Sequence, residues 1–125
     1  MKSILIAEGH EDVAELFADL FARDGWTVTT YRDGWRAADA LSGRTPNDAG
    51  LVSNRLHSMS GVELITRIRA LDHRKHMPIV MVTGAVEVAV LAAALAAGAD
   101  DVLYKPTDVA IVVATVTKCV ERRRH

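Results

Sequence analysis

The stretch Asp48-Ala49-Gly50-Leu51-Val52-Ser53-Asn54-Arg55-Leu56-His57 decides the fold. Its short apolar run ends in polar residues and is followed by helical patterning, which is typical of a buried strand that delivers side chains to the edge of a sheet. In open parallel α/β sheets the working site lies just beyond the carboxyl ends of the central strands. We therefore expect any chemistry to gather around Ser53, which carries a hydroxyl and not a carboxylate.

Length and composition favour a single domain over residues 1–125. Half of the 125 residues are apolar, so the chain can bury a core without disulfides or metal. Fifteen basic residues against sixteen acidic ones leave a net charge of -1, which gives no long-range field to attract nucleic acid or an anionic membrane. We therefore expect neither as a partner.

Two further features bear on location. The one cysteine, Cys119, cannot make an internal disulfide and lies in an apolar helical pattern, so we predict a packed thiol and a reducing compartment. The apolar run over 4–7 is too short for a secretory signal, and the weakly charged run over 84–99 is shorter than the roughly 20 residues that span a bilayer. These observations predict a cytoplasmic protein.

Strand and helix patterns alternate along the whole chain. Short apolar or β-rich runs predict strands over 4–7, 26–31, 79–83 and 100–104, besides the strand that ends at Ser53. Apolar residues at spacings of three and four predict helices over 11 to about 24, 35–41, 60–71, from after 84 to 97, and about 108–122, with a charged loop over 72–77. Such alternation over short connections requires a parallel sheet covered on both faces by right-handed crossovers, an α/β fold.

Polar side chains stand where the predicted strands end. Glu8 follows the first strand, Ser53 ends the third, Thr83 ends the fourth and Lys105 follows the fifth. Because parallel strands bring their carboxyl ends to one edge of the sheet, we expect these four residues to lie near one another.

The order and spacing of these residues resemble the receiver domain of two-component response regulators, and the resemblance covers the whole chain. The stretches that carry it are Ile4-Leu5-Ile6-Ala7-Glu8, Ser60-Gly61-Val62-Glu63-Leu64, Pro78-Ile79-Val80-Met81-Val82-Thr83, Ala97-Gly98-Ala99-Asp100-Asp101 and Tyr104-Lys105-Pro106. The resemblance implies a doubly wound five-stranded parallel sheet of order 2-1-3-4-5 flanked by five helices, the flavodoxin-like or CheY-like fold. It also implies a phosphorylation site at the carboxyl edge of the sheet.

The family's site residues carry over to this chain only in part. Its two acidic residues after the first strand fall on Glu8 and Gly9, so one carboxylate is missing, and its phospho-accepting aspartate falls on Ser53. The residue whose backbone carbonyl the family places on the metal is Arg55, and the family's loop proline is His57.

Three other positions match the family. Thr83, Tyr104 and Lys105 correspond to its switch hydroxyl, its switch aromatic and the lysine that pairs with the phosphate. A simpler interpretation of Tyr104 is a partly buried packing residue.

These departures remove the chemistry of a conventional receiver. Magnesium takes about six oxygen ligands and is usually held through carboxylates, of which only Glu8 remains, so we expect magnesium binding to be lost or very weak and no other cofactor. Ser53 lacks the carboxylate that forms an acyl phosphate and has no evident base, so phosphotransfer is expected to fail.

The simplest interpretation of Ser53 is a hydroxyl at the end of a strand that bonds a neighbouring residue. In the same interpretation, Glu8 and Lys105 pair with each other. The Arg55 side chain either turns to solvent or folds in toward Glu8.

The helix that ends at 97 and the last helix carry more apolar residues than one core-facing stripe requires. One interpretation is a harmless surface of small residues, and the other is a contact surface that includes Val90, Leu91, Ala94 and Ile111. In the receiver family this face is where domains commonly dimerise or meet partners, so we predict a homodimer through these two helices.

Together these residues predict a degenerate receiver, a non-enzymatic module that signals by protein contact without phosphorylation. The predicted partner is a signalling protein such as a histidine kinase or an output protein. Two alternatives stay open: a phosphorelay receiver with an unconventional acceptor, and a sensor whose altered pocket, with Lys105 and Arg55 as positive groups, binds an anion or another small ligand.

Overall fold

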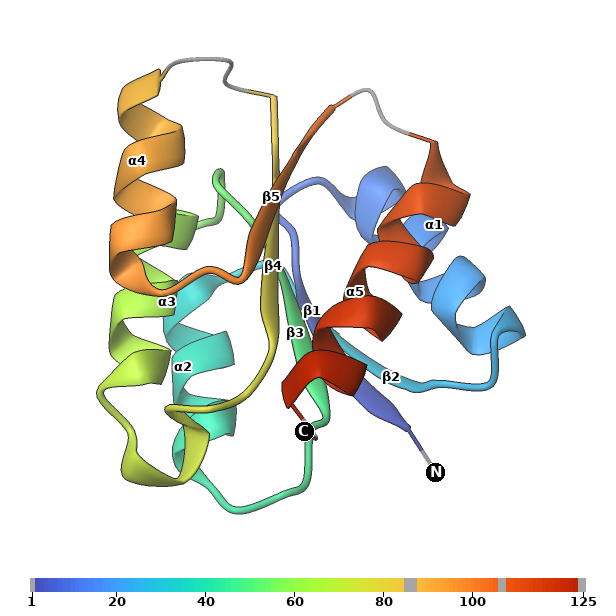
Figure 1. The fold of residues 1–125 in the computed structure, drawn as a ribbon, viewed down its shortest axis with the longest axis horizontal. Helices are drawn as coiled ribbons and strands as arrows, with labels where there is room; N and C mark the ends of the chain where they lie inside the picture. Colours follow the sequence, from blue (N-terminus) through green and yellow to red (C-terminus); the bar gives the residue numbers. More distant parts are fainter. Residues whose placement is uncertain (1, 85–87, 106–107, 124–125) are drawn as a thin grey trace.

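Five parallel strands form the centre of the molecule (Figure 1). The structure is a computed structural model that describes residues 2–84, 88–105 and 108–123. The strands are β1 (Ser3–Ala7), β2 (Thr27–Tyr31), β3 (Ala49–Ser53), β4 (Ile79–Thr83) and β5 (Asp101–Tyr104). Their order across the sheet is β2-β1-β3-β4-β5, so the predicted α/β fold and strand order are confirmed.

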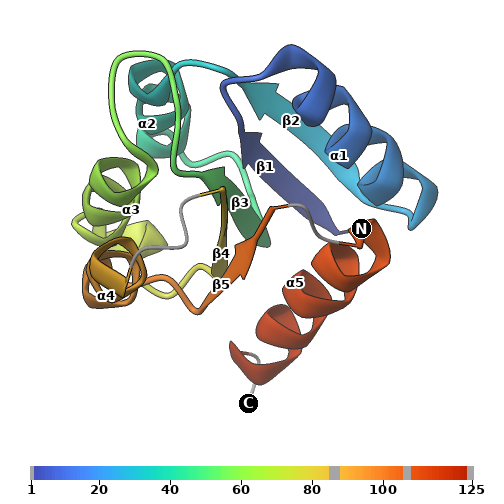
Figure 2. The ribbon, with the colours of Figure 1, turned by 90° about the horizontal axis from the view of Figure 1, so that it is seen from above.

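Helices cover both faces of this sheet. They are α1 (Glu11–Arg23), α2 (Gly34–Ser42), α3 (Gly61–Arg69), α4 (Val88–Ala97) and α5 (Val109–Arg123). Seen from above, α1 and α5 lie on one side of the sheet and α2, α3 and α4 on the other (Figure 2). Neighbouring helices pack as the pairs α1 and α5, α2 and α3, and α3 and α4.

The core consists of two clusters, one on each face of the sheet. Along β1, Leu5 and Ala7 belong to the cluster under α2, α3 and α4, whereas Ile4 and Ile6 belong to the cluster under α1 and α5. This alternation follows from the two-residue repeat of a strand. Cys119 lies in the second cluster, only 3% exposed, and burial raises the pKa of its thiol. The predicted packed thiol is confirmed.

Two helices begin at side-chain caps. The Ser60 hydroxyl accepts the backbone N–H of Glu63 and starts α3, as predicted, and Asp33 accepts the N–H groups of Trp35 and Arg36 at the start of α2. Such caps satisfy amide groups that the first turn of a helix leaves without intrahelical partners. They fix the points at which α2 and α3 leave the carboxyl edge of the sheet.

The segment 72–77 differs from the predicted charged loop. It contains a short 3₁₀ turn, Asp72–Arg74, and Arg74 is only 5% exposed. The Arg74 guanidinium donates to the backbone oxygens of Leu41, Gly43 and Thr45. A charged residue is buried here because it bonds carbonyl groups of the α2–β3 connection, which a count of charges in the sequence does not reveal.

Element ends otherwise fall within one or two residues of the prediction; the larger of these differences is at α3, which ends at Arg69 and not near 71. The first residues predicted for the fourth helix, 85–87, and Pro106 of the predicted Tyr104-Lys105-Pro106 motif lie outside the described residues. In the described part of the chain, every helix is too short or too polar to cross a bilayer.

Candidate functional site

Glu8, Ser53 and Lys105 meet at the carboxyl edge of the sheet. Ser53 Oγ donates a hydrogen bond of 2.5 Å to Glu8 Oε1, and Lys105 Nζ donates one of 2.5 Å to the same oxygen. The second carboxylate oxygen, Oε2, accepts the backbone N–H of His10 at 3.0 Å. The hydroxyl of Ser53 and the ammonium of Lys105 are therefore both bonded to Glu8.

The Glu8 carboxylate is the electrostatic centre of this cluster. Its side chain is 1% exposed, and such burial by itself raises the pKa of a carboxyl group. The His10 N–H, the Lys105 ammonium and the Ser53 hydroxyl bond the ionised form and outweigh the burial, so the pKa of Glu8 lies below its ordinary value. Glu8 is therefore ionised at neutral pH, and its buried carboxylate is compensated by the partly exposed ammonium of Lys105.

Gly9 lies against the loop that follows β3. A Cβ at Gly9 would stand 2.6 Å from the backbone oxygen of Arg55, closer than real Cβ contacts. The loop after β1 and the loop after β3 thus approach each other where no side chain fits. An aspartate, which the receiver family has at the Gly9 position, would require one of these backbones to move.

The Arg55 side chain is exposed, and among the described residues it makes no ion pair with a carboxylate. Of the two orientations that the sequence left open, the structure has the one toward solvent. Of the two positive groups in the alternative of an anion-binding pocket, Lys105 is paired with Glu8 and Arg55 is exposed.

Backbone bonds fasten the loop after β3 to the loop after β2. His57 N–H donates to the oxygen of Arg32 at 3.0 Å, and the oxygen of His57 accepts the N–H of Gly34 at 2.9 Å. Ser58, with a positive φ of 76°, donates its hydroxyl to Asp33 Oδ2 at 2.8 Å. The loop is thus fixed by contacts within the chain.

Asp33 and Ser58 were missed by the sequence analysis. The Asp33 side chain accepts a hydrogen bond from the Ser58 hydroxyl and also caps α2. Both contacts lower the pKa of Asp33, and the bond from Ser58 has the larger effect. An aspartate before Gly34 is a recognisable helix-start signal, and it identifies Asp33 as the cap of α2. Nothing in the sequence pairs it with Ser58.

Thr83 and Tyr104 lie on the two neighbouring strand ends. Thr83 is 3% exposed, and its backbone oxygen accepts the N–H of Lys105 at 2.8 Å. Tyr104 is half-buried and packs against the cluster under α2, α3 and α4, as expected of a packing residue. The backbone bond between Thr83 and Lys105 places the lysine over the end of the sheet.

Few oxygen ligands for a divalent cation are found at this edge. In the described part of the chain, no three His, Cys, Asp or Glu side chains gather closely enough to hold a metal ion. Glu8 is the acid of the cluster with Ser53 and Lys105, and both of its oxygens already accept hydrogen bonds from the protein. Magnesium prefers several hard oxygen ligands, so this donor set does not fit it.

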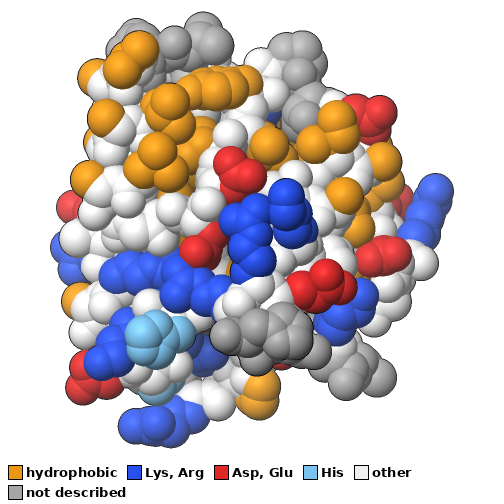
Figure 3. Space-filling model, viewed as in Figure 1, with side chains coloured by type: hydrophobic (Ala, Val, Ile, Leu, Met, Phe, Trp, Pro, Cys, Tyr) orange, Lys and Arg blue, Asp and Glu red, His pale blue; other side chains and the backbone are white. Residues whose placement is uncertain are grey.

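Part of the predicted contact surface on α4 and α5 is exposed. Figure 3 shows hydrophobic side chains over both helices, with charged side chains below them. Ile111 is 51% exposed, and Val90 and Leu91 are half-buried.

Ala94 does not belong to this surface, and its inclusion in the prediction was wrong. It is 0% exposed and lies in the core cluster under α2, α3 and α4, against which Leu91 and Ala97 of the same helix also pack. The exposed large residues of α4 are instead Val88 at 79% and Leu95 at 49%. In a helix that is apolar nearly all round, the sequence does not distinguish the buried face from the exposed one.

Comparison with known proteins gives a consistent result. A family model described as the response regulator receiver domain matches residues 4–117. The transcriptional regulatory protein CseB of Streptomyces avermitilis is 30% identical over 122 residues, which cover 98% of this chain and 50% of that protein. The sensory transduction protein RegX3 of Mycobacterium tuberculosis is 32% identical and is covered to 52% by the aligned residues, against 98% of this chain. The chain thus spans about half the length of these curated relatives.

Solved structures agree in fold. A CheY-like receiver domain protein from Methanospirillum hungatei superposes with a TM-score of 0.92 at 21% identity, covering 99% of this chain and 97% of that one. The receiver domain of a sensor histidine kinase from Pseudomonas aeruginosa, with magnesium in its active-site cleft, superposes with a TM-score of 0.88 at 25% identity, covering 96% and 98%.

Proposed function

Because this chain belongs to the response regulator receiver domain family, we propose that it is a degenerate receiver of two-component signalling that acts by protein contact and does not accept a phosphoryl group. It would not act as an enzyme, and it would work in the cytoplasm beside its signalling partners. The observation that carries the proposal is the closed cluster of Glu8, Ser53 and Lys105.

The chemistry of this cluster supports the proposal. A receiver forms an acyl phosphate on a carboxylate, whereas Ser53 offers a hydroxyl that would need a base. Glu8 is the nearest candidate base, but its lowered pKa makes it a weak one, and it already accepts two other hydrogen bonds. Lys105, the residue that resemblance assigns to the phosphate, is engaged by Glu8.

We further propose that the module does not use magnesium. Glu8 is surrounded by donors from Ser53, Lys105 and His10, so a cation would have to displace an ammonium group to reach it. The close contact of Gly9 with the Arg55 carbonyl leaves no room for a second carboxylate. A signal would therefore pass through the surface of the domain, with a histidine kinase or an output protein as the partner.

Phosphorylation is the direct test. The protein is incubated with acetyl phosphate and magnesium, and its intact mass is measured beside that of Ser53→Ala. We expect no added phosphate on either protein. A phosphate adduct on the parent chain that is absent from Ser53→Ala would show an unconventional acceptor and contradict the proposal.

A further inference from the structure

The strand β2 is an open edge of the sheet. Thr27 N–H donates to the oxygen of Lys2 and Glu8 N–H donates to the oxygen of Tyr31, which shows that the odd-numbered residues of β2 bond β1. In a parallel pair the intervening residues, Val28 and Thr30, direct their backbone N–H and C=O groups away from the partner strand. No described residue bonds these outward groups.

The sequence of β2 does nothing to protect this edge. Thr27-Val28-Thr29-Thr30-Tyr31 contains no charge, no proline and no bulge, and four of its five residues are β-branched. Natural edge strands usually carry such protective features, because an open edge pairs with other strands. At the opposite edge, β5 is shorter and begins with the charged, exposed Asp101. The unprotected edge is therefore specific to β2.

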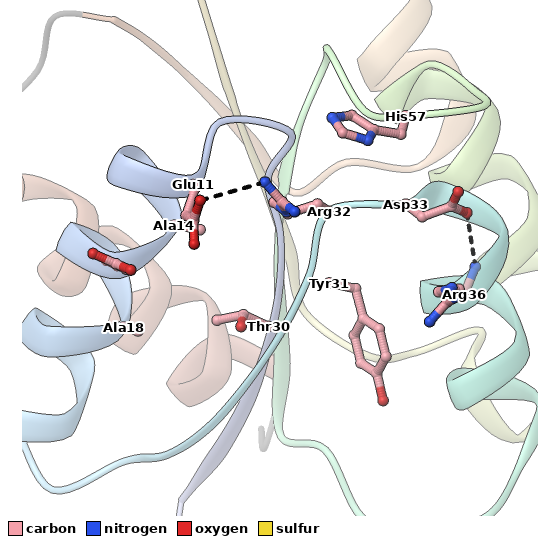
Figure 4. Close-up of a pocket in the computed structure, with 10 residues that line it drawn as sticks. Glu11, Ala14, Ala18, Thr30, Tyr31, Arg32, Asp33, Arg36 and His57 are labelled. Carbon is pink, nitrogen blue, oxygen red and sulfur yellow. Dashed lines mark hydrogen bonds and ion pairs between the residues drawn. The ribbon is translucent and has the colours of Figure 1, made fainter.

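A hollow of about 680 Å³ lies at the carboxyl end of this edge. Figure 4 shows that α1 forms one wall and the start of α2 the other, with Thr30 and Tyr31 between them. The strand side chains alternate between the walls: Val28, and by the two-residue repeat Thr30, face the α1 side, whereas Tyr31 packs on the α2 side. The hollow thus lies at the carboxyl end of the path that an added strand would take along β2.

The two walls differ in charge. Glu11 and Glu15 line the α1 wall, whereas Arg32 and Arg36 line the other wall together with Asp33. Glu11 and Arg32 form an exposed ion pair of 3.7 Å near the carboxyl end of β2. Among the described residues, Glu15 and Arg36 make no side-chain ion pair. Asp33 is bonded by the Ser58 hydroxyl and by the first amides of α2, and its carboxylate lies in the field of Arg36. The α1 wall thus keeps Glu15 outside any ion pair, and the α2 wall keeps Arg36.

We propose that this groove binds an extended peptide segment of a partner protein, which joins the sheet as a further strand beside β2. Successive residues of a strand point to opposite faces. A bound strand would therefore place basic side chains against Glu15 on α1 and acidic side chains against Arg36 on α2. The segment recognised is one in which lysine or arginine alternates with glutamate or aspartate. Backbone bonds to Val28 and Thr30 supply the affinity and the charged walls supply the register.

The probe is a capped synthetic peptide in which lysine and glutamate alternate. Its control has the same composition, with all lysines before all glutamates, so that each face of the strand carries both charges. Binding is followed by calorimetry, and amide hydrogen exchange is measured residue by residue. We expect the alternating peptide to slow exchange at Val28 and Thr30, and to leave Thr29 and Tyr31, whose amides already bond β1, unchanged.

Two sets of variants test the mechanism. Thr30→Pro removes the outward N–H of an edge residue without removing a bond to β1, and it should weaken binding of the peptide about tenfold. Thr30→Val keeps that N–H and should bind the peptide as the parent does.

Arg36→Glu makes both walls acidic and should also weaken binding of the peptide about tenfold. The double variant Glu15→Lys with Arg36→Glu exchanges the charges at these two positions. It should restore binding, because a shift of the peptide by one residue turns its lysines toward α2 and its glutamates toward α1. This exchange does not depend on the proline variant being stable.

Three results would overturn the proposal: no binding of the alternating peptide, equal binding of the block peptide, or protection of Val28 and Thr30 by self-association without any peptide. None of them bears on phosphorylation, so the proposed function is tested separately.

Discussion

At the scale of single residues, Glu8 holds the site together. Replacing it by Gln keeps the size of the side chain and removes the charge that compensates Lys105. We expect Glu8→Gln to lower the free energy of unfolding by about 1–3 kcal/mol at neutral pH, because a partly exposed ammonium loses its partner and the Ser53 bond weakens. Urea unfolding measures this change.

The dependence of folding stability on pH provides a second test of Glu8. The pKa of Glu8 in the folded protein lies below the ordinary value of 4.5, so its contribution to stability is present above about pH 4.5 and is lost as the pH falls through the folded-state pKa. Glu8→Gln should lack this part of the acid destabilisation. The exposed Glu15→Gln is the matched control, and an equal loss of stability in both variants would contradict the central role of Glu8.

Gly9 tests the contact between the two loops. A methyl group there would meet the Arg55 carbonyl at 2.6 Å, whereas at Gly43 the nearest atom, the oxygen of Ala40, would lie at an ordinary 3.5 Å. We expect Gly9→Ala to cost about 1–3 kcal/mol of unfolding free energy and Gly43→Ala to change it by less than about 0.5 kcal/mol. Thermal or urea unfolding of these two variants measures both changes.

The same contact changes how a receiver site could be rebuilt. Ser53→Asp restores the carboxylate at the strand end, whereas Gly9→Asp must displace the Arg55 backbone. If Gly9→Ala proves as stable as Gly43→Ala, the loops have room for a second acid, and the proposed loss of magnesium binding would need to be reconsidered.

At the scale of elements, α4 presents two faces that its sequence does not distinguish. Ala94 is 0% exposed and Leu95 is 49% exposed, although they are neighbours in an apolar run. We expect Ala94→Glu to destabilise the fold by about 3 kcal/mol or more, because it buries a charge without a partner. Leu95→Glu should leave the fold intact. Circular dichroism with urea unfolding measures both, and a stable Ala94→Glu protein would show that α4 is oriented differently.

At the scale of the whole molecule, the exposed residues of α4 and α5 underlie the predicted homodimer. Val88, Leu95 and Ile111 are all at least 49% exposed, and burying such side chains between two copies would remove apolar surface from water. We expect the chain to self-associate, independently of phosphodonors. Sedimentation over a concentration series should show a dimer that Leu95→Glu with Ile111→Glu dissociates.

Leu16 provides the control for this experiment. It is also 49% exposed but lies on α1, away from α4 and α5. Leu16→Glu should therefore leave the association unchanged. A monomer at every concentration, or a dimer that persists in the double variant, would contradict the prediction.

The amino-acid sequence by itself determined the alternation of strands and helices, the strand order through the family resemblance, and which residues stand at the strand ends. These features follow from local patterns, since β3 and β4 are continuous apolar runs and α1 and α3 carry their apolar residues at helical spacing. The meeting of Glu8, Ser53 and Lys105 could be predicted for the same reason, because parallel strands share one carboxyl edge.

Only the tertiary structure decided the rest, because it depends on contacts between segments far apart in the chain. The sequence does not show that Arg74 is buried by carbonyl groups of the α2–β3 connection, that Ser58 bonds Asp33, or that Gly9 touches the Arg55 backbone. It also does not show which side of α4 faces the core, since a helix that is apolar all round has no pattern to orient it. Such features are set by packing and by the bonding needs of backbone groups, which no local pattern records.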